Sequence, residues 1–234
     1  MSEQILHSFN KMAESYADSS HLQNQVARIL LDFCDEFFSD VKIVLDLGAG
    51  SGNVAKNITH KIDSFIALDN APNLLSLHPL KLDNIASIRL VECDFERYDF
   101  SERYDLIIAS SALQWAKDLD TILQKIANTK NARVAFAIFT NASLWELHSF
   151  LGTKSPLKSA DEVVFLAQKY FDIDFKVESF HLNFSSREAF LSYLKGCALL
   201  GGGHLNFSEK KRFRFEIPYF EANFEVLFIK GSVK

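Results

Sequence analysis

The residues best suited to chemistry form a glycine-rich segment whose letters run Asp46-Leu47-Gly48-Ala49-Gly50-Ser51-Gly52. It follows a short apolar run at residues 42–47 and precedes a stretch of helical character at 54–62. Glycines let a backbone turn tightly and approach a ligand closely, because no Cβ stands in the way. A strand, a glycine turn and a helix in this order are typical of a cofactor loop. The cofactor-binding candidates here are Asp46, Gly48, Gly50 and Gly52.

The glycine spacing and the acid before it distinguish between two cofactors. A dinucleotide loop has the spacing GxGxxG and holds a pyrophosphate at the helix N-terminus. This chain has GxGxG preceded by Asp46, and an acid beside a pyrophosphate is unfavourable. S-adenosylmethionine carries an ammonium and a sulfonium, which suit the acid. We therefore expect S-adenosylmethionine, with S-adenosylhomocysteine as product, and not a nicotinamide cofactor.

Two more acids end apolar runs further along the chain. Asp69, beside Asn70, ends the run 64–69, and its two carboxylate oxygens could accept both ribose hydroxyls. Asp94 follows the run 88–93 and could accept the adenine amino group, with Phe95 packing near the base. Nicotinamide sites also use an acid in the position of Asp69, and helix capping or an ordinary turn remains the alternative role for each acid.

The segment Ser110-Ser111-Ala112-Leu113-Gln114-Trp115 follows the apolar run 104–110. Open α/β sheets bind ligands beyond the carboxyl ends of their strands. We expect Ser110 and Gln114 to contact the cofactor and Trp115 to lie between cofactor and substrate. Core packing is the alternative for Trp115.

Short apolar runs that alternate with helical stretches predict the elements that position these residues. The alternation up to residue 140 is typical of parallel βαβ units, with strands at 42–47, 64–69, 88–93, 104–110 and 133–139 and a helix at 119–127. After it we expect a helix at 160–170, a strand at 175–184, a helix at 186–199 capped by Ser185 or Ser186, and a last strand at 224–230. Residues 1–38 have helical periodicity.

Composition restricts the class of protein. The 234 residues are 48% hydrophobic and 24% charged, as in an ordinary globular protein, and the net charge of −5 argues against a broad nucleic-acid or membrane surface. No apolar run is long enough to span a bilayer. Cys34, Cys93 and Cys197 lie far apart, so they do not have the spacing of a zinc site. The start lacks a secretion signal, which favours the reduced cytoplasm. We expect no metal.

Several segments resemble a known family. The order DLGAGSG, ALD, ECDFE and LIIASSALQW over roughly residues 40–140 resembles the class I S-adenosylmethionine-dependent methyltransferases. The segments 9–16 (FNKMAESY), 21–25 (HLQNQ), 143–147 (SLWEL) and 194–196 (LKG) resemble the malonyl-acyl-carrier-protein O-methyltransferases of biotin synthesis. The chain departs from the common RPGG before the fifth strand, where it has Lys130-Asn131-Ala132-Arg133.

This resemblance implies a single Rossmann-like α/β domain with a mostly parallel seven-stranded sheet, helices on both faces and an inserted helical lid. The expected parts are an amino-terminal helical cap at 1–38, a cofactor-binding core at 40–140, a substrate and lid region at 141–223 and the last strand at 224–231. The implied reaction methylates the free carboxylate of malonyl on an acyl carrier protein, giving the ester that starts pimeloyl synthesis. The alternatives are methylation of another small carboxylic acid and a non-catalytic S-adenosylmethionine-binding module.

A carboxylate is already ionised at neutral pH, so this reaction requires positioning and charge placement more than a strong base. We expect Lys195, with Trp115 and Tyr16, at the catalytic site, and Arg187 as a second cation for the substrate. Gln25 and Tyr16 would close over the methionine end of the cofactor. An acidic carrier protein requires a local basic patch, and the densest positive cluster is Lys210, Lys211, Arg212 and Arg214. A solvated charge run is the alternative for that cluster, as a surface lysine is for Lys195.

Overall fold

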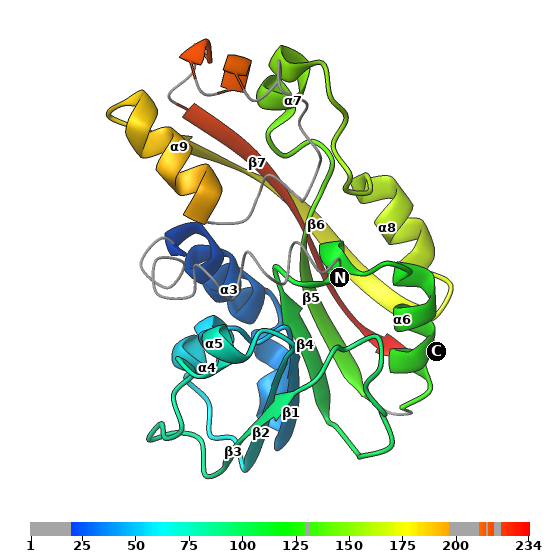
Figure 1. Ribbon diagram of the computed structural model, residues 1–234. Coiled ribbons are helices and arrows are strands. Elements are labelled where there is room, and N and C mark those ends of the chain that lie inside the picture. Colours follow the sequence, from blue (N-terminus) through cyan, green and yellow to red (C-terminus); the bar gives the residue numbers. More distant parts are fainter. Residues whose placement is uncertain (1–19, 130–131, 197–210, 214, 218–220) are drawn as a thin grey trace.

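The computed structural model describes residues 20–129, 132–196, 211–213, 215–217 and 221–234 (Figure 1). These residues form a seven-stranded sheet in the order β3-β2-β1-β4-β5-β7-β6. Its strands are β1 (Ile43–Leu47), β2 (Ser64–Asp69), β3 (Ile88–Glu92), β4 (Leu106–Ser110), β5 (Arg133–Phe139), β6 (Phe171–Asn183) and β7 (Glu221–Val233).

The sheet is parallel from β3 to β5 and turns antiparallel at β7. The chain order reverses between β1 and β4, which are neighbours although β2 and β3 come between them in sequence. Such a reversal leaves a crevice beyond the carboxyl ends of the central strands. The strands β6 and β7 pair along their whole length, from Phe171 opposite Val233 to Asn183 opposite Glu221.

Helices cover both faces of the sheet (Figure 1). The described helices are α3 (His21–Phe33), α4 (Asn53–Asn57), α5 (Pro72–Leu75), α6 (Leu119–Ala127), α7 (Trp145–Leu151), α8 (Ala160–Ala167) and α9 (Arg187–Gly196). The helices α3, α4 and α5 lie on one face and α6 and α8 on the other. A 3-10 helix, η1 (Asp35–Ser39), follows α3, and a second, η2 (Leu113–Trp115), follows β4.

Side chains alternate between two hydrophobic cores along each central strand. In β4, Leu106 and Ile108 pack into the core that contains α3, whereas Ile107 and Ala109 pack into the core that contains α6. Successive residues of a strand point to opposite faces, so a strand covered on both sides must be apolar throughout. This explains why the central strands, such as β4, appear in the sequence as apolar runs.

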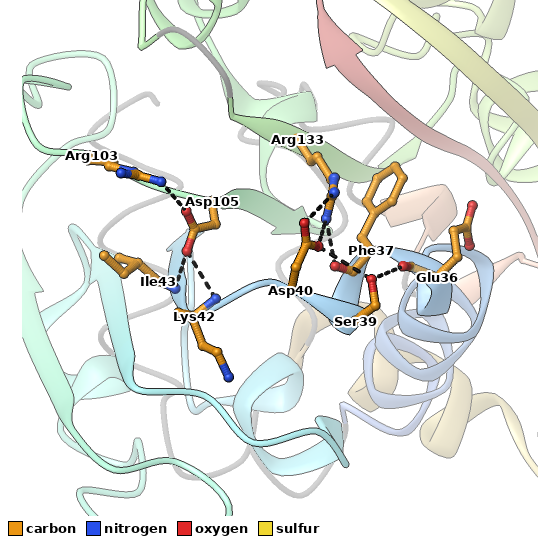
Figure 2. Close-up of polar contacts among 9 residues, drawn as sticks. All are labelled: Glu36, Phe37, Ser39, Asp40, Lys42, Ile43, Arg103, Asp105 and Arg133. Atoms are coloured by element: carbon orange, nitrogen blue, oxygen red, sulfur yellow. Dashed lines mark hydrogen bonds and ion pairs between the residues drawn. The ribbon is translucent and has the colours of Figure 1, made fainter.

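A polar network connects the amino-terminal ends of the central strands, opposite the ends that carry the glycine loop (Figure 2). The carboxylate of Asp105 accepts hydrogen bonds from the backbone N–H groups of Lys42 (3.0 Å) and Ile43 (2.9 Å), where β1 begins. Arg133, at the start of β5, donates to the carboxylate of Asp40 and to the backbone carbonyl of Phe37 (2.7 Å). These contacts fix where the central strands start, and hence where their opposite ends lie.

The structure confirms the expected α/β architecture and most of its elements. The strand 64–69 and the helix 119–127 have the predicted bounds, and Ser186 caps α9 through a bond from the Ala189 N–H (3.1 Å). The helix expected at 54–62 is shorter, because α4 ends at Asn57, and α7 was not predicted at all. The strand expected at 175–184 starts earlier, at Phe171, and ends at Asn183, and the last strand extends beyond 224–230 at both ends.

The cap expected at 1–38 can be compared only in part, since residues 1–19 lie outside the described chain. Within it, residues 21–33 are helical, as predicted. The helices α7, α8 and α9 occupy the region expected to form a lid. Their covering function stays a prediction.

Candidate functional site

A pocket lies at the carboxyl ends of the central parallel strands. It encloses about 700 Å³ of space, a volume that includes space open to solvent. Residues from α3, the glycine loop, the end of β2 and the segment after β4 line it: Gln23, Asp46, Gly48, Ala49, Gly50, Ser51, Asn53, Val54, Asp69, Asn70, Leu74, Phe95, Ser110, Ser111, Ala112 and Trp115.

The glycine loop packs too tightly for other residues. Gly48 has φ of +72°, and a Cβ there would lie 2.3 Å from the Cβ of Ala112. Gly52 has φ of +88°, and its Cβ would lie 2.7 Å from Cδ of Pro79. Both positions therefore require glycine for backbone conformation and for space. The loop is anchored where the N–H groups of Gly48 (2.8 Å) and Ala49 (3.0 Å) donate to the carbonyl of Leu68.

Asp69 ties the end of β2 to the same loop. One carboxylate oxygen, Oδ2, accepts from the Gly50 N–H (2.9 Å), and the other, Oδ1, accepts from the Ala71 N–H (2.8 Å). Burial raises the pKa of Asp69, and these backbone hydrogen bonds oppose that rise. Each carboxylate oxygen can accept a second hydrogen bond, so the residue has acceptor capacity left for a ligand.

Asp46 is an acid buried without compensation. It is 1% exposed, and neither carboxylate oxygen has a hydrogen-bond partner among the described residues. Burial raises the pKa of Asp46 well above its usual value, and the nearby negative charge of Asp69 raises it further. An unpaired buried carboxylate is costly. A ligand that brings a positive charge to this pocket would relieve that cost.

Gln23 was missed by the sequence reasoning, which chose Gln25 on the same helix. Gln23 is 4% exposed and lines the pocket, and its Oε1 has no partner among the described residues. Gln25 is exposed and lies outside the pocket lining. The helical period could have separated the two, because Gln23 is one turn from the buried Val26 and Ala27, whereas Gln25 is on the opposite side.

The segment after β4 forms the other wall. Ser111 has φ of +62°, a strained value for a residue with a side chain. The hydroxyls of Ser110 and Ser111 are buried and have no partner within the described chain. Phe95 is buried and supplies an aromatic surface. These features give the pocket unused hydrogen-bonding groups beside an apolar wall.

The structure brings together most, but not all, of the predicted cofactor residues. The pocket lining contains Asp46, Gly48, Gly50, Asp69, Asn70, Phe95, Ser110 and Trp115. Gly52 supports the loop as the residue before α4 but does not line the pocket. Asp94 is also outside the lining, and its carboxylate accepts from the Glu96 N–H (2.9 Å), as a turn residue does. Gln114 lines a neighbouring pocket instead.

The predicted substrate and partner cations are only partly described. Arg187, at the start of α9, donates to the carbonyl of Phe215 (2.8 Å). Arg212 donates to the carbonyl of Phe150 (2.6 Å), with its guanidinium 4.6 Å from the centre of the Phe150 ring, and Lys211 is exposed. Tyr16, Lys210, Arg214 and the side chain of Lys195 lie outside the described residues.

The pocket fits S-adenosylmethionine better than a dinucleotide. Two unpaired carboxylate oxygens on Asp46 and a free amide oxygen on Gln23 form a cluster of acceptors, which suits a cation. A pyrophosphate would place like charges beside Asp46. Within the described chain there is no cluster of histidine, cysteine and acidic residues that could hold a metal ion.

Comparison with known proteins agrees with this fit. Residues 44–131 match the family model described as a methyltransferase domain, and they contain the glycine loop, Asp46 and Asp69. This segment is a methyltransferase domain of the S-adenosylmethionine-dependent type. An S-adenosylmethionine-dependent methyltransferase of Thermotoga maritima shares the fold, with a TM-score of 0.58 over 98% of this chain and all of that one, at 15% identity.

Curated relatives of the methyltransferase include two malonyl-[acyl-carrier protein] O-methyltransferases that align over most of the chain. The protein from Chlorobium luteolum is 27% identical over 80% of this chain and 74% of its own length. The protein from Ilyobacter polytropus is 26% identical over 92% of this chain and 82% of its own length. Other relatives with this name align over 50% to 66% of their length. In the described part of the methyltransferase, no helix has the length and apolar character needed to cross a bilayer.

Proposed function

We propose that the methyltransferase acts on the free carboxylate of a malonyl group attached to an acyl carrier protein. The observation that carries the methyl-transfer chemistry is the unpaired, buried Asp46 in the wall of a glycine-lined pocket. The choice of acceptor is supported by the relatives, which are named for this substrate and align with up to 92% of the chain. The product would be the methyl ester that starts pimeloyl synthesis.

Distinct residues are proposed for the two ends of the cofactor. Asp46 and Gln23 would receive the ammonium of the methionine end, because both present unpaired buried acceptor oxygens. Asp69 would accept the ribose hydroxyls with the acceptor capacity left by its bonds to Gly50 and Ala71. Asn70 and Phe95 would border the adenine.

The chemistry requires little from a general base. S-adenosylmethionine supplies a methyl group made electrophilic by its sulfonium. The malonyl carboxylate is ionised at neutral pH, so its oxygen would form the new C–O bond directly, and the electrons of the broken S–C bond would stay on sulfur. The negative carboxylate and the positive sulfonium neutralise each other, and no proton needs to be moved. The protein is therefore left to orient the two reactants and exclude water.

Trp115 is proposed to border both reactants, since it lines the cofactor pocket and the neighbouring one. Lys195 and Tyr16 are proposed as further groups near the reacting carboxylate. Lys211 and Arg212, with Lys210 and Arg214, are proposed to attract an acidic carrier protein, and Arg187 to support the substrate side. The region 141–223 is proposed as the substrate and lid region of one domain that also contains the cap at 1–38. The cytoplasm is proposed as the location of the protein.

The direct test is mass spectrometry of malonyl-acyl carrier protein incubated with the enzyme and S-adenosylmethionine. We expect a mass gain of one CH2 unit on the carrier and formation of S-adenosylhomocysteine. Malonyl-coenzyme A, free malonate and aconitate serve as parallel acceptors, and Asp46→Asn as a variant deficient in cofactor binding. Faster methylation of a free acid than of the carrier-bound group would reject the proposed acceptor. Cofactor binding without turnover on any acceptor would indicate a binding module.

A further inference from the structure

A second pocket lies next to the cofactor pocket and shares Trp115 with it. It encloses about 370 Å³, including space open to solvent. Apart from Trp115, its wall includes Gln114 from η2, Phe139 from the end of β5, His148 from α7, and Leu144 and Leu157 from the segments on either side of α7. The pocket is thus at the carboxyl edge of the sheet, where a second reactant would meet the cofactor.

Gln114, which lines this second pocket, has an unsatisfied acceptor. Its Nε2 donates to the backbone carbonyl of Ser111 (2.7 Å). Because a carbonyl can only accept, this bond fixes which end of the amide is nitrogen. The other end, Oε1, is buried and has no partner among the described residues. Buried polar atoms are nearly always paired, so this oxygen points to a ligand that carries a donor.

His148 offers a complementary donor to this pocket when its Nδ1 accepts the hydroxyl proton of Thr153. Its Nδ1 lies 2.9 Å from Oγ1 of Thr153, whose backbone N–H in turn donates to the carbonyl of His148 (2.9 Å). Burial lowers the pKa of His148, which keeps the ring neutral at physiological pH. A neutral ring that accepts the Thr153 hydroxyl proton at Nδ1 carries its own proton on Nε2. That N–H is then available to a ligand.

The backbone around α7 is held in an unusual conformation. Leu144, which lines the second pocket, has φ of +56° although it is a leucine. Its N–H donates to the carbonyl of Asn223 in β7 (2.7 Å), which holds the strained residue in place. Strained residues persist where the surrounding structure enforces them, and they gather at functional sites. Here the strain sets the start of α7 and thereby the position of His148.

We propose that this second pocket receives the acyl group of the methyl acceptor, with Nε2–H of His148 donating a hydrogen bond to the thioester carbonyl oxygen. Trp115 borders both the acyl group and the cofactor, and Oε1 of Gln114 accepts a hydrogen bond from an amide N–H of the carrier arm. His148 is then a substrate-positioning contact and takes no part in proton transfer. This inference rests on the proposed function, because it takes a malonyl thioester as the acceptor.

The test compares steady-state kinetics of wild-type enzyme, His148→Ala and His148→Gln with malonyl-acyl carrier protein as the varied substrate. For His148→Ala we expect KM for the carrier substrate to rise about fivefold to tenfold, the loss expected for one hydrogen bond between neutral groups. The Kd for S-adenosylmethionine should stay within about twofold of wild type. His148→Gln should recover part of the loss, since its amide can donate in place of Nε2. His60→Gln is the matched control, because His60 bonds to Asp35 (2.8 Å) outside both pockets.

A second variant guards against a misfolded or merely loosened α7. In Leu157→Trp a larger side chain fills part of the second pocket. Turnover with the carrier substrate should therefore fall while the Kd for S-adenosylmethionine is unchanged. If wild type methylates the carrier substrate and both pocket variants keep its KM and kcat, the second pocket is not the acyl site. An equal loss of cofactor affinity in His148→Ala would assign the pocket to the cofactor. No turnover by wild type would instead reject the proposed function.

Discussion

The carboxylate of Asp69 accepts a 2.9 Å hydrogen bond from the backbone N–H of Gly50, 19 residues earlier in the chain. This bond joins the end of β2 to the glycine loop after β1. The acid expected to bind the ribose therefore also shapes the loop that cradles the rest of the cofactor. Loss of the Asp69 side chain would therefore have two effects: it would remove a ligand contact, and it would release the glycine loop.

We predict that Asp69→Ala binds S-adenosylmethionine at least about 30-fold more weakly than wild type, because two charge-assisted hydrogen bonds and the ribose contact are lost. The N–H groups of Gly50 and Ala71 would lose their acceptor, so the melting temperature should also fall. Calorimetric titration and thermal unfolding measure the two effects. Unchanged affinity in the variant would show that Asp69 neither binds the ribose nor organises the loop.

We predict that Asp46→Asn stabilises the cofactor-free protein and abolishes cofactor binding. The raised pKa means that the folded state holds this proton more tightly than the unfolded state. Below the usual carboxyl pKa both states are protonated and Asp46 carries no penalty. As the pH rises from that value through the folded-state pKa, the unfolded state is increasingly favoured. The stability gain of the variant should therefore grow with pH, as measured by urea unfolding at about pH 5 and about pH 8.

We predict that S-adenosylmethionine binding releases protons over the pH range below the raised pKa of Asp46. A cation beside the carboxylate lowers its pKa, so Asp46 gives up its proton when the cofactor binds. Affinity should increase with pH in this range and level off above it. Calorimetry in buffers of different ionisation enthalpy measures the released protons directly. Binding that is independent of buffer, with affinity independent of pH, would show that Asp46 does not contact the cation.

We predict that Asp105→Ala lowers stability by about 1–3 kcal/mol without changing the KM for S-adenosylmethionine. The carboxylate of Asp105 accepts hydrogen bonds from the backbone N–H groups of Lys42 and Ile43 (Figure 2). These groups lie where β1 begins, at the end of the strand away from the pocket. Urea unfolding and initial rates at saturating acceptor measure the two quantities. Asp63→Ala, at an exposed acid without an ion pair of its own among those described, is the control and should change neither.

The sequence by itself determined the fold class and the part of the cofactor pocket formed by the glycine loop and Asp69. Apolar runs such as 65–68 and 134–139 predict strands covered on both faces, and their alternation with helices predicts a parallel sheet. The glycine loop and Asp69 are adjacent to those strands in the chain, so their place at the carboxyl edge followed from the strands. Local pattern sufficed because the chain neighbours of these residues also fix their surroundings.

Tertiary structure alone decided which residues far apart in the chain face one pocket. The helical period places Gln23 on the buried face of α3, but only the packing of that helix brings this face to the cofactor pocket. His148 and Gln114 come from α7 and η2 and line the same second pocket, and the bond from Leu144 to Asn223 in β7 helps to fix where α7 starts. A local pattern gives the face of an element but not what that face meets, which depends on how the elements pack against one another.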